Sequence, residues 1–458
     1  NEQMKKYLPD KEKSKINLTR QNYNFLQRTV KDPELRNLIE QLYFKKSDSS
    51  MIMFTKLVLL RHKYANLSGY KTYYELIKKK SQASSDDVKI LINDLISKLE
   101  ERSRKEIERI HRELNKDNYD NKVNLPDIIY YYEKLKTKNL FIPNNVLKVI
   151  IEIFHEYFNI VIEQQDEKLF HNNVSTYVVK NNSVIMGYLY LDLSKRKNKS
   201  IVSPTSIHLC QQYVGLNNNI YHTKVFIISG YESLTEKCIT YSDIVSLFRE
   251  FGYAIQLMAY NTNKGIIFKN DFDMMLSQIL EYIAWEKTTI EKICKNYNAN
   301  IQEHILFTRF IDFANSIKLK SINALFDHII HNSEDLAKLI EDNINDEKYL
   351  NTIIKKLYQK LYYDFTINQN DVINTEIIGI HPSLINQELN NAGMLHIDIL
   401  NQILSFSIFS FIKGNSKNGN DFITCVLNSE PEKTKKLINN YISKFKDNWK
   451  ERAPDWKP

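Results

Sequence analysis

The chain has 458 residues, of which 43% are hydrophobic and 26% are charged, and its formal net charge is +8. These values are ordinary for a globular protein, and so mild a positive charge permits contact with nucleic acid without indicating it. Glycine (10) and proline (9) are scarce, so few residues interrupt helices and we expect a mainly helical chain.

The cysteines and the apolar runs exclude further classes of protein. Cys210, Cys238, Cys294 and Cys425 lie far apart and form no CxxC, so the sequence indicates neither a zinc ribbon nor a disulfide framework. No apolar run reaches the roughly eighteen residues that span a bilayer, and no signal peptide is visible. We therefore expect an intracellular, cytoplasmic protein that makes no membrane contact.

Two features concern the source of the chain. Asn, Lys, Ile and Tyr are abundant, which is typical of an AT-rich genome such as that of a parasite or a large virus. We therefore expect the protein to be part of a viral or parasite assembly. The sequence starts at Asn1 rather than at Met, so we expect residues upstream of Asn1 to be missing.

The N-terminal part, residues 1 to about 125, is predicted to form long amphipathic helices. Val88, Ile92, Leu95 and Leu99 recur at helical spacing, and the preceding "SSDD" is a capping signal. Residues 115–127 are predicted to be a loop, and helices resume over residues 144–159.

The middle of the chain has the alternation of a small sheet. Residues 175–200 are predicted to contain two strands that turn at Asn181 and Asn182, and "KVFIISG" continues the strand pattern. Helices are expected again from Ser242 onward. Residues 399–412 are predicted to be a buried helix, and residues 414–421 a polar loop.

One helix, predicted for residues 242–258 ("SDIVSLFREFGYAIQLM"), has the outline of a metal site. Ser242 can cap it, and five apolar residues fall on one buried face: Ile244, Phe248, Phe251, Ile255 and Met258. Zincins place two histidines four residues apart on such a helix, with a glutamate after the first. Here Glu250 follows Arg249 and precedes Tyr253, so the helix alone leaves a degenerate zinc motif and a plain core helix both open.

The sequence around this helix gives it context. The chain reads L-F-R-E-F-G-Y-A-I-Q at the helix, followed by "DFDMMLSQILEYIAWE" at residues 271–286. Upstream lie "LRHKYANLSGYKTYYELI", "LFHNNVSTYVV" and "GYLYLDLSKRKNK", and downstream lies "FANSIKLKSINALFDHIIH" at residues 313–331.

As a set, these blocks resemble the thimet oligopeptidase and neurolysin family of zinc metallopeptidases. The family has L-F-H-E-F-G-H-A-L-H at the helix, D-F-V-E-A-P-S-Q-L-L-E with a following W-E, and F-D-x-x-L-H further on. The second block matches at eight positions: Asp271, Phe272, Ser277, Gln278, Leu280, Glu281, Trp285 and Glu286. The resemblance runs from Leu60 to the C-terminus and implies that the family's N-terminal helical portion is largely absent.

Carried over residue by residue, the resemblance places the family's three zinc ligands on Arg249, Tyr253 and Met274. Arginine has no acceptor atom, a thioether suits a hydrolytic zinc site poorly, and neutral tyrosine is a weak ligand at neutral pH. Glu250 occupies the general-base position but has no metal-bound water to deprotonate. We therefore expect no zinc and no other cofactor, and no active catalytic residue.

The substrate-binding segment has diverged as well. The family has a segment like H-x-x-x-G-Y-x-x-x-Y-Y-x-Y-L-W-S, whose closest match here is residues 390–405. The tyrosine positions then include Leu395, Ile399 and Gln402, and His381 and His396 match no histidine position securely. The family's P-G-G-S loop is replaced by "LNSEPEK" at residues 427–433.

Other residues could carry chemistry in place of this site. His328 and His331 form an HxxH, Cys210 follows a histidine, and Glu281 and Glu286 could pair. No third metal ligand is evident beside the two histidines. Cys210 is more simply interpreted as a buried cysteine, and the two glutamates as ion-paired residues. The basic runs at residues 78–80, 195–199 and 444–458 are typical of solvated faces. We also hypothesise that Arg249 pairs with Glu250 or another inherited carboxylate.

The sequence therefore predicts a mainly α-helical, elongated zincin-like oligopeptidase fold with a deep channel and a small β-sheet beside the former active site. The expected parts are an N-terminal helical region (1–125), a degenerate peptidase core (126–380) and a C-terminal helical region (381–458). The expected function is that of an inactive peptidase homologue, a structural or protein- or peptide-interaction subunit. Two alternatives are a divergent active peptidase with an unusual metal site and a basic scaffold on nucleic acid.

Overall fold

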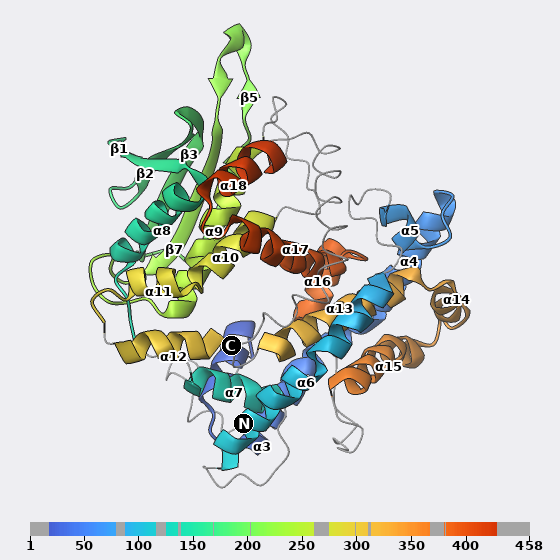
Figure 1. Ribbon diagram of the computed structural model, residues 1–458. Helices are drawn as coiled ribbons and strands as arrows, with labels where there is room; N and C mark the ends of the chain where they lie inside the picture. The colour runs from blue at the N-terminus through green and yellow to red at the C-terminus, as the bar shows by residue number, and fades with distance from the viewer. Residues whose placement is uncertain are drawn as a thin grey trace. The chain divides into compact units, whose positions relative to one another are not determined.

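The computed structural model describes residues 18–78, 88–115, 125–135, 139–167, 169–201, 203–260, 274–297, 299–309, 313–366, 380 and 382–427. The described residues are mainly helical with a small sheet, as the sequence predicts (Figure 1). They form two compact units. Asn1–Lys136 and Thr308–Ile399 make up the first unit, and Thr137–Phe307 and Leu400–Pro458 make up the second.

These units differ from the three consecutive segments expected from the sequence, 1–125, 126–380 and 381–458. Each unit joins two separated parts of the chain, because helices distant in sequence pack together. In the first unit, the hydroxyl of Thr55 donates a hydrogen bond to the carbonyl of Leu350, 2.9 Å away. Hydrophobic periodicity is a local signal and does not predict which distant helices pack together.

The first unit is helical. Its elements are α2 (Arg20–Thr29), α3 (Pro33–Phe44), the 3₁₀ turn Lys45–Ser47, α4 (Asp48–Leu67), α5 (Tyr73–Lys78), α6 (Val88–Asn115), α7 (Leu125–Leu135), α13 (Phe313–Asn332), α14 (Glu334–Asp342), α15 (Glu347–Thr366) and α16 (Pro382–Asn391). Helices α12 (Ala299–Arg309) and α17 (His396–Ile412) have residues in both units.

The long helix α6 packs against α13, and a buried carboxylate joins them. Glu106 accepts hydrogen bonds from the backbone N–H groups of Ala314 (3.0 Å) and Asn315 (3.1 Å), at the start of α13. These N–H groups have no partner within their own helix, and the helix dipole favours a negative charge there. Burial raises the pKa of Glu106, although these hydrogen bonds oppose the increase.

Helix α7 begins inside the segment predicted to be a loop. Asp127, which the sequence assigns to that loop, is fully buried and forms an ion pair with the buried Arg36 of α3. Arg36 also donates hydrogen bonds to the carbonyls of Val30 (2.8 Å) and Lys31 (2.9 Å). The polar residues around Pro126 are typical of a loop. A buried ion pair leaves no signature in local composition, so the sequence does not indicate this helix.

The second unit contains the sheet and the helices around it. Its elements are α8 (Pro143–Phe158), β1 (Ile160–Gln165), β2 (Ser175–Asn181), β3 (Val184–Ser194), β4 (Thr205–Cys210), β5 (Tyr213–Val214), the 3₁₀ turn Leu216–Asn218, β6 (Ile220–Tyr221), β7 (Thr223–Tyr231), α9 (Tyr241–Ala259), α10 (Met275–Ala284), α11 (Lys287–Ile293), α18 (Ser416–Asp421) and the π-helical turn Phe422–Leu427.

The five-stranded sheet has the order β1-β2-β3-β7-β4, so β4 is an edge strand. Strands β3 and β7 pair in parallel, and the other neighbours pair antiparallel. Burial alternates along β7, as expected for a strand with one face against a core. Side chains from β7, α8, α9 and α10 share one apolar cluster, which fixes α9 against the sheet.

Local details differ from the sequence predictions by short shifts. The hairpin between β2 and β3 turns at Asn182 and Ser183, which have φ of 47° and 67°, rather than at Asn181 and Asn182. Residues 416–421, predicted to be a loop, form α18, because the Asn415 side chain caps them by accepting from Asn418 N–H.

Residues 84–87, the predicted capping signal, lie outside the described residues. Over the described ranges, no helix is long and apolar enough to cross a membrane.

Candidate functional site

Helix α9 carries the candidate site, and its five predicted apolar residues are buried as expected. The cap of the helix lies two residues earlier than predicted. Thr240 is the cap, in a reciprocal capping box with Asp243, whose backbone N–H bonds to the Thr240 hydroxyl at 3.3 Å. Ser242 is therefore an exposed residue of the first turn rather than the cap.

Gly252 brings α9 into close contact with the start of α10. A Cβ atom at this position would lie 2.7 Å from the carbonyl oxygen of Leu276 and 2.8 Å from the Cα of Ser277. The Ser277 hydroxyl also donates to the carbonyl of Arg249 at 2.8 Å. These contacts place the motif of α9 next to the segment that follows Met274, as the resemblance implies.

Glu250 contacts the edge strand of the sheet. Its Oε2 atom accepts the backbone N–H of Ser206 on β4 at 2.7 Å, and the Ser206 hydroxyl donates to the backbone carbonyl of Glu250 at 3.1 Å. Glu250 is half-buried. The carboxylate in the general-base position therefore attaches α9 to β4.

The hypothesis of an ion pair at Arg249 finds no support in this arrangement. Arg249 is exposed, and within the described ranges no carboxylate forms an ion pair with it; Glu250 turns to β4 instead. Arg249 and Glu250 do not pair because the side chains of adjacent helical residues point in different directions.

The three positions assigned to zinc ligands do not fit a zinc ion. Arg249 is exposed, Tyr253 is half-buried against the apolar cluster, and Met274 is half-buried at the cap of α10. Zinc in hydrolytic sites takes imidazole and carboxylate donors, and this set offers a guanidinium, a phenol and a thioether. This donor set therefore differs from the imidazole and carboxylate donors that the related motifs carry at these positions.

A second polar contact between α9 and α10 was not predicted from the sequence. The side-chain oxygen of the fully buried Gln256 accepts the backbone N–H of Leu276 at 2.8 Å, and its amide donates to the Tyr260 hydroxyl at 2.7 Å. Leu276 stands where the related motif has proline, which has no N–H, and Gln256 stands where that motif has histidine. Comparing the two motifs position by position could have indicated this pair.

Of the three predicted substrate-tyrosine positions, one precedes α17 and two lie within it. Leu395 precedes α17, and its backbone N–H donates to Asp327 at 2.9 Å. Ile399 is a buried core residue, and the carbonyl of Gln402 accepts from the Tyr282 hydroxyl of α10 at 3.1 Å. His381 and residues 428–433 of the replaced loop lie outside the described residues.

His331, the second histidine of the HxxH on α13, is part of a buried hydrogen-bond network in the first unit. His331 bonds through Nδ1 to the Asp327 carboxylate at 3.0 Å, and its Nε2 contacts Arg61 at 3.1 Å. Asp327 also accepts the Gly393 N–H at 2.5 Å, and Gly393 has φ of 74°, which glycine adopts without strain. Both ring nitrogens of His331 are engaged, which supports a structural role.

The remaining candidates have ordinary structural partners. Cys210 is half-buried, with its thiol 3.8 Å from the His222 carbonyl, and Glu286 forms an ion pair with Lys413 at 2.7 Å. Glu281 is half-buried. Among the residues that the structure describes, no group of three His, Cys, Asp or Glu side chains is placed to hold a metal ion.

The basic run at residues 195–199 is solvated in part, since Lys195 and Lys197 are exposed, whereas Arg196 and Lys199 pair with Asp192. Arg196 bonds to Asp192 at 2.6 Å, and Lys199, which is buried, bonds to Asp192 at 2.9 Å. Burial alone would raise the pKa of Asp192, but hydrogen bonds from these two cations outweigh it and hold that pKa below its usual range. These two cations are therefore not available to a phosphate backbone.

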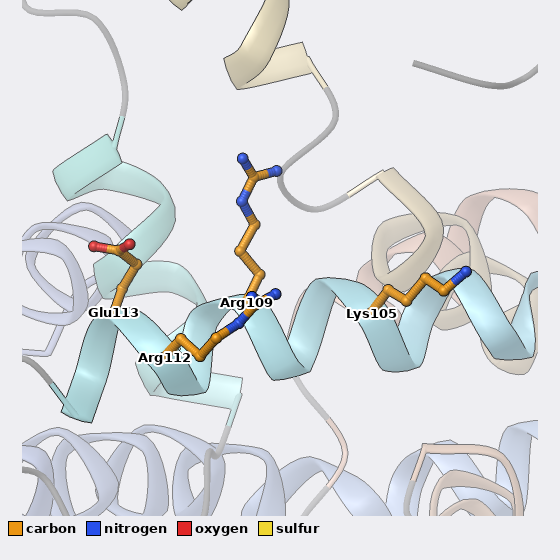
Figure 2. A pocket seen from close by; sticks show the side chains of 4 residues that line it. All are labelled: Lys105, Arg109, Arg112 and Glu113. Atoms are coloured by element: carbon orange, nitrogen blue, oxygen red, sulfur yellow. The ribbon is translucent and has the colours of Figure 1, made fainter.

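A cavity of about 690 Å³ lies over the C-terminal half of α6, lined by Lys105, Arg109, Arg112 and Glu113 (Figure 2). Burial and the charge of Arg112 lower the pKa of Arg109, whereas Glu113 opposes this. Lys105 pairs with Glu101 at 2.7 Å.

Comparison with known proteins identifies a family for the chain. A family model described as "Peptidase family M3" matches residues 26–381. A curated relative from Arabidopsis thaliana, described as "Probable thimet oligopeptidase", is 24% identical over 342 residues. That match covers 66% of this chain and 46% of the relative, so the chain spans about half the length of the curated relative.

Among solved structures, "PZ peptidase A with inhibitor 2" is similar to this chain with a TM-score of 0.50 and 14% sequence identity. The similarity covers 95% of this chain and 67% of that chain. At this identity the likeness concerns the fold alone, and it agrees with the mainly helical fold that the sequence predicts.

Proposed function

Because this chain belongs to peptidase family M3, we propose that it is a member without zinc-dependent catalysis that serves as a structural or polypeptide-binding subunit. The observation that carries the proposal is the donor set at the ligand positions. Arg249, Tyr253 and Met274 together provide no imidazole and no carboxylate. Without the ion, no bound water reaches a pKa near neutrality, and Glu250 has no proton to remove.

The contact of Glu250 supports the same proposal. One carboxylate oxygen holds the backbone N–H of Ser206 at 2.7 Å, so the side chain has a structural task on β4. A fold that keeps its helix packing without its reacting groups can still bind polypeptides, since activity does not follow from the fold.

Among the described residues, the edge strand β4 offers a place for a polypeptide segment beyond its contacts with α9. β4 is an edge strand, and two of its apolar side chains, Ile207 and Leu209, are 38% and 50% exposed. An extended segment can add to such an edge through main-chain hydrogen bonds and side-chain pockets. Because Glu250 already holds the Ser206 N–H, the segment would pair with the rest of the strand.

The test measures zinc and cleavage on one sample. The purified chain is incubated with zinc, dialysed and analysed for metal, and cleavage of a quenched fluorescent peptide is followed with and without added zinc. We expect no stoichiometric zinc and no turnover. One zinc per chain with chelator-sensitive cleavage would overturn the proposal and favour a divergent peptidase.

A matched control restores the donors. The triple variant Arg249→His, Tyr253→His, Met274→Glu keeps the backbone contacts of Ser277 and Ser206 and adds the ligand set that the related motifs carry. We expect this variant to bind one zinc ion, which would locate the defect in the donors. If the variant and the natural chain retain zinc equally, the three positions are not the metal site.

Binding measurements address the polypeptide partner. Fluorescence anisotropy with an extended apolar peptide should show saturable binding that weakens in an Ile207→Lys, Leu209→Lys variant. Affinity for nucleic acid with a steep salt dependence, and none for peptides, would favour the scaffold alternative instead.

A further inference from the structure

A hairpin arm extends from the sheet of the second unit. Strands β4 and β7 continue into the short ribbon of β5 and β6, which projects beyond the sheet (Figure 1). Its tip is the turn 216–218, where Asn217 and Asn218 have φ of 64° and 58°. We call residues 211–223 the arm.

Both faces of the ribbon carry exposed apolar side chains. Tyr213 pairs with Tyr221, with their rings stacked at 4.8 Å, and Val214 pairs with Ile220. Successive residues of a strand point to opposite faces, so the two tyrosines lie on one face and the two aliphatic residues on the other. The exposed fractions lie between 39% and 57% in the ribbon, and Leu216 at the tip is 90% exposed.

The arm contains no charged residue. None of the thirteen positions in "QQYVGLNNNIYHT" is Asp, Glu, Lys or Arg, whereas 26% of the whole chain is charged. Soluble surfaces usually intersperse charges to prevent association, and edge strands commonly carry lysine for this purpose. A projecting, uncharged and apolar arm therefore has the features of a contact surface.

We propose that the arm binds a second copy of this chain, arm against arm, in a two-fold symmetric dimer. Such an interface uses the same patch on both copies, so the patch must be complementary to itself. The arm meets this condition, because it has no charge to repel its own copy and offers matching rings, aliphatic side chains and asparagine amides. The ribbon is only two strands wide, and a second ribbon would add pairing partners.

The charge of the chain favours the arm over other surfaces for this contact. Two copies each carry a net charge of +8 and repel each other, and this repulsion falls with distance. A contact through an uncharged projection keeps the charged bodies apart. The contact area is small, so we expect a weak dimer that forms as concentration rises.

A membrane is the less favoured partner. Interfacial segments that bind membranes combine apolar side chains with lysine or arginine, which attract anionic lipids. The arm has neither cation. This inference is independent of catalysis and does not require the function proposed above.

Sedimentation velocity on the full chain, over a roughly hundredfold range of concentration, tests the proposal. We expect a monomer–dimer equilibrium. Leu216→Asp should raise the dissociation constant at least about tenfold, since it places like charges at the contact. Leu67→Asp is the matched control, because Leu67 is 89% exposed at the end of α4, in the other unit, and should leave the equilibrium unchanged.

Circular dichroism and melting temperature establish that both variants fold. A chain that stays monomeric at every concentration overturns the proposal, as does a dimer that Leu216→Asp and Leu67→Asp weaken equally. Flotation of the monomer with vesicles containing phosphatidylserine, abolished by Leu216→Asp, would assign the arm to a membrane and likewise overturn it.

Discussion

The α9–α10 pair in the second unit and α13 in the first unit both correspond to motifs with histidines and carboxylates. The α13 motif has both its carboxylate and its histidine, whereas the α9 motif has Glu250 but neither histidine. In α13, Asp327 and His331 remain, fully buried and hydrogen-bonded. In α9, arginine and tyrosine stand at the positions of the related motif's histidines, while Gly252 and Ser277 remain in helix contact.

The difference shows which residues the fold requires. Asp327 accepts three hydrogen bonds from the protein itself, so its loss leaves buried donors without partners. A residue whose main partner is a metal ion loses that constraint once the ion is not used. Under the function proposed above, the fold retains residues that bond to the protein and releases residues that bond to a ligand.

The most severe test of this comparison is Asp327→Ala. We expect a loss of about 3–5 kcal/mol in the free energy of unfolding, because the backbone N–H groups of Gly393 and Leu395 would lose their acceptor. The His331 ring would keep the backbone carbonyl of residue 327, which lies 3.0 Å from Nδ1. Chemical denaturation measures it. The exposed Asp342 provides the control, since Asp342→Ala should change stability by less than about 0.5 kcal/mol. Equal effects would contradict the structural role.

Gly252→Ala tests the packing of α9 on α10. Alanine favours a helix, but its Cβ would meet the Leu276 carbonyl oxygen at 2.7 Å. We expect a net destabilisation of roughly 1–3 kcal/mol. Ser242→Ala, at an exposed position of the same helix, should be nearly neutral. A variant at Gly252 that is as stable as the natural chain would show that the helices can separate without cost.

The buried His62 and the half-buried His328 predict acid sensitivity. Burial, followed by the charge of His396, lowers the pKa of His328 to about 4, and burial also lowers the pKa of His62. The unfolded chain, with histidine pKa values of about 6.5, binds more protons in this window, so stability falls as the pH falls from about 6.5 to about 4. Melting curves should show this loss, and His328→Gln should reduce it.

Glu250 separates a structural from a catalytic carboxylate. Glu250→Ala removes the acceptor of the Ser206 N–H and should cost about 1 kcal/mol. Glu250→Gln keeps an oxygen acceptor and should be nearly neutral. If the glutamine variant instead abolishes a measurable peptidase activity while the fold stays intact, Glu250 is a general base.

Arg249→Ala should have the smallest effect. The side chain is exposed and forms no ion pair within the described part of the chain, so we expect a change below about 0.5 kcal/mol in stability. A fall in melting temperature comparable to that of Gly252→Ala would revive the hypothesis of an arginine-centred ion pair.

Much of the fold could be predicted from the sequence, because apolar periodicity and strand alternation are local signals. The buried face of α9, the hairpin of β2 and β3 and the helix α17 follow from them. The partners of the polar residues could not, since Arg36 with Asp127 and Glu106 with Ala314 join segments far apart in sequence.

The candidate site was predictable in its positions but not in its contacts. The motif located Arg249, Glu250, Tyr253 and Met274. It carried no sign that Glu250 would bond to Ser206, because strand β4 enters the site only through tertiary packing.

The division of each unit into two parts has a consequence for synthesis. Helix α6 emerges from the ribosome well before α13, its packing partner, because Thr137–Phe307 must be translated in between. Until then Glu106 has no helix terminus to cap, and the apolar face of α6 remains exposed. Closing so long a loop slows folding and prolongs exposure to aggregation. A fragment ending before α13 should therefore depend on chaperones for its solubility.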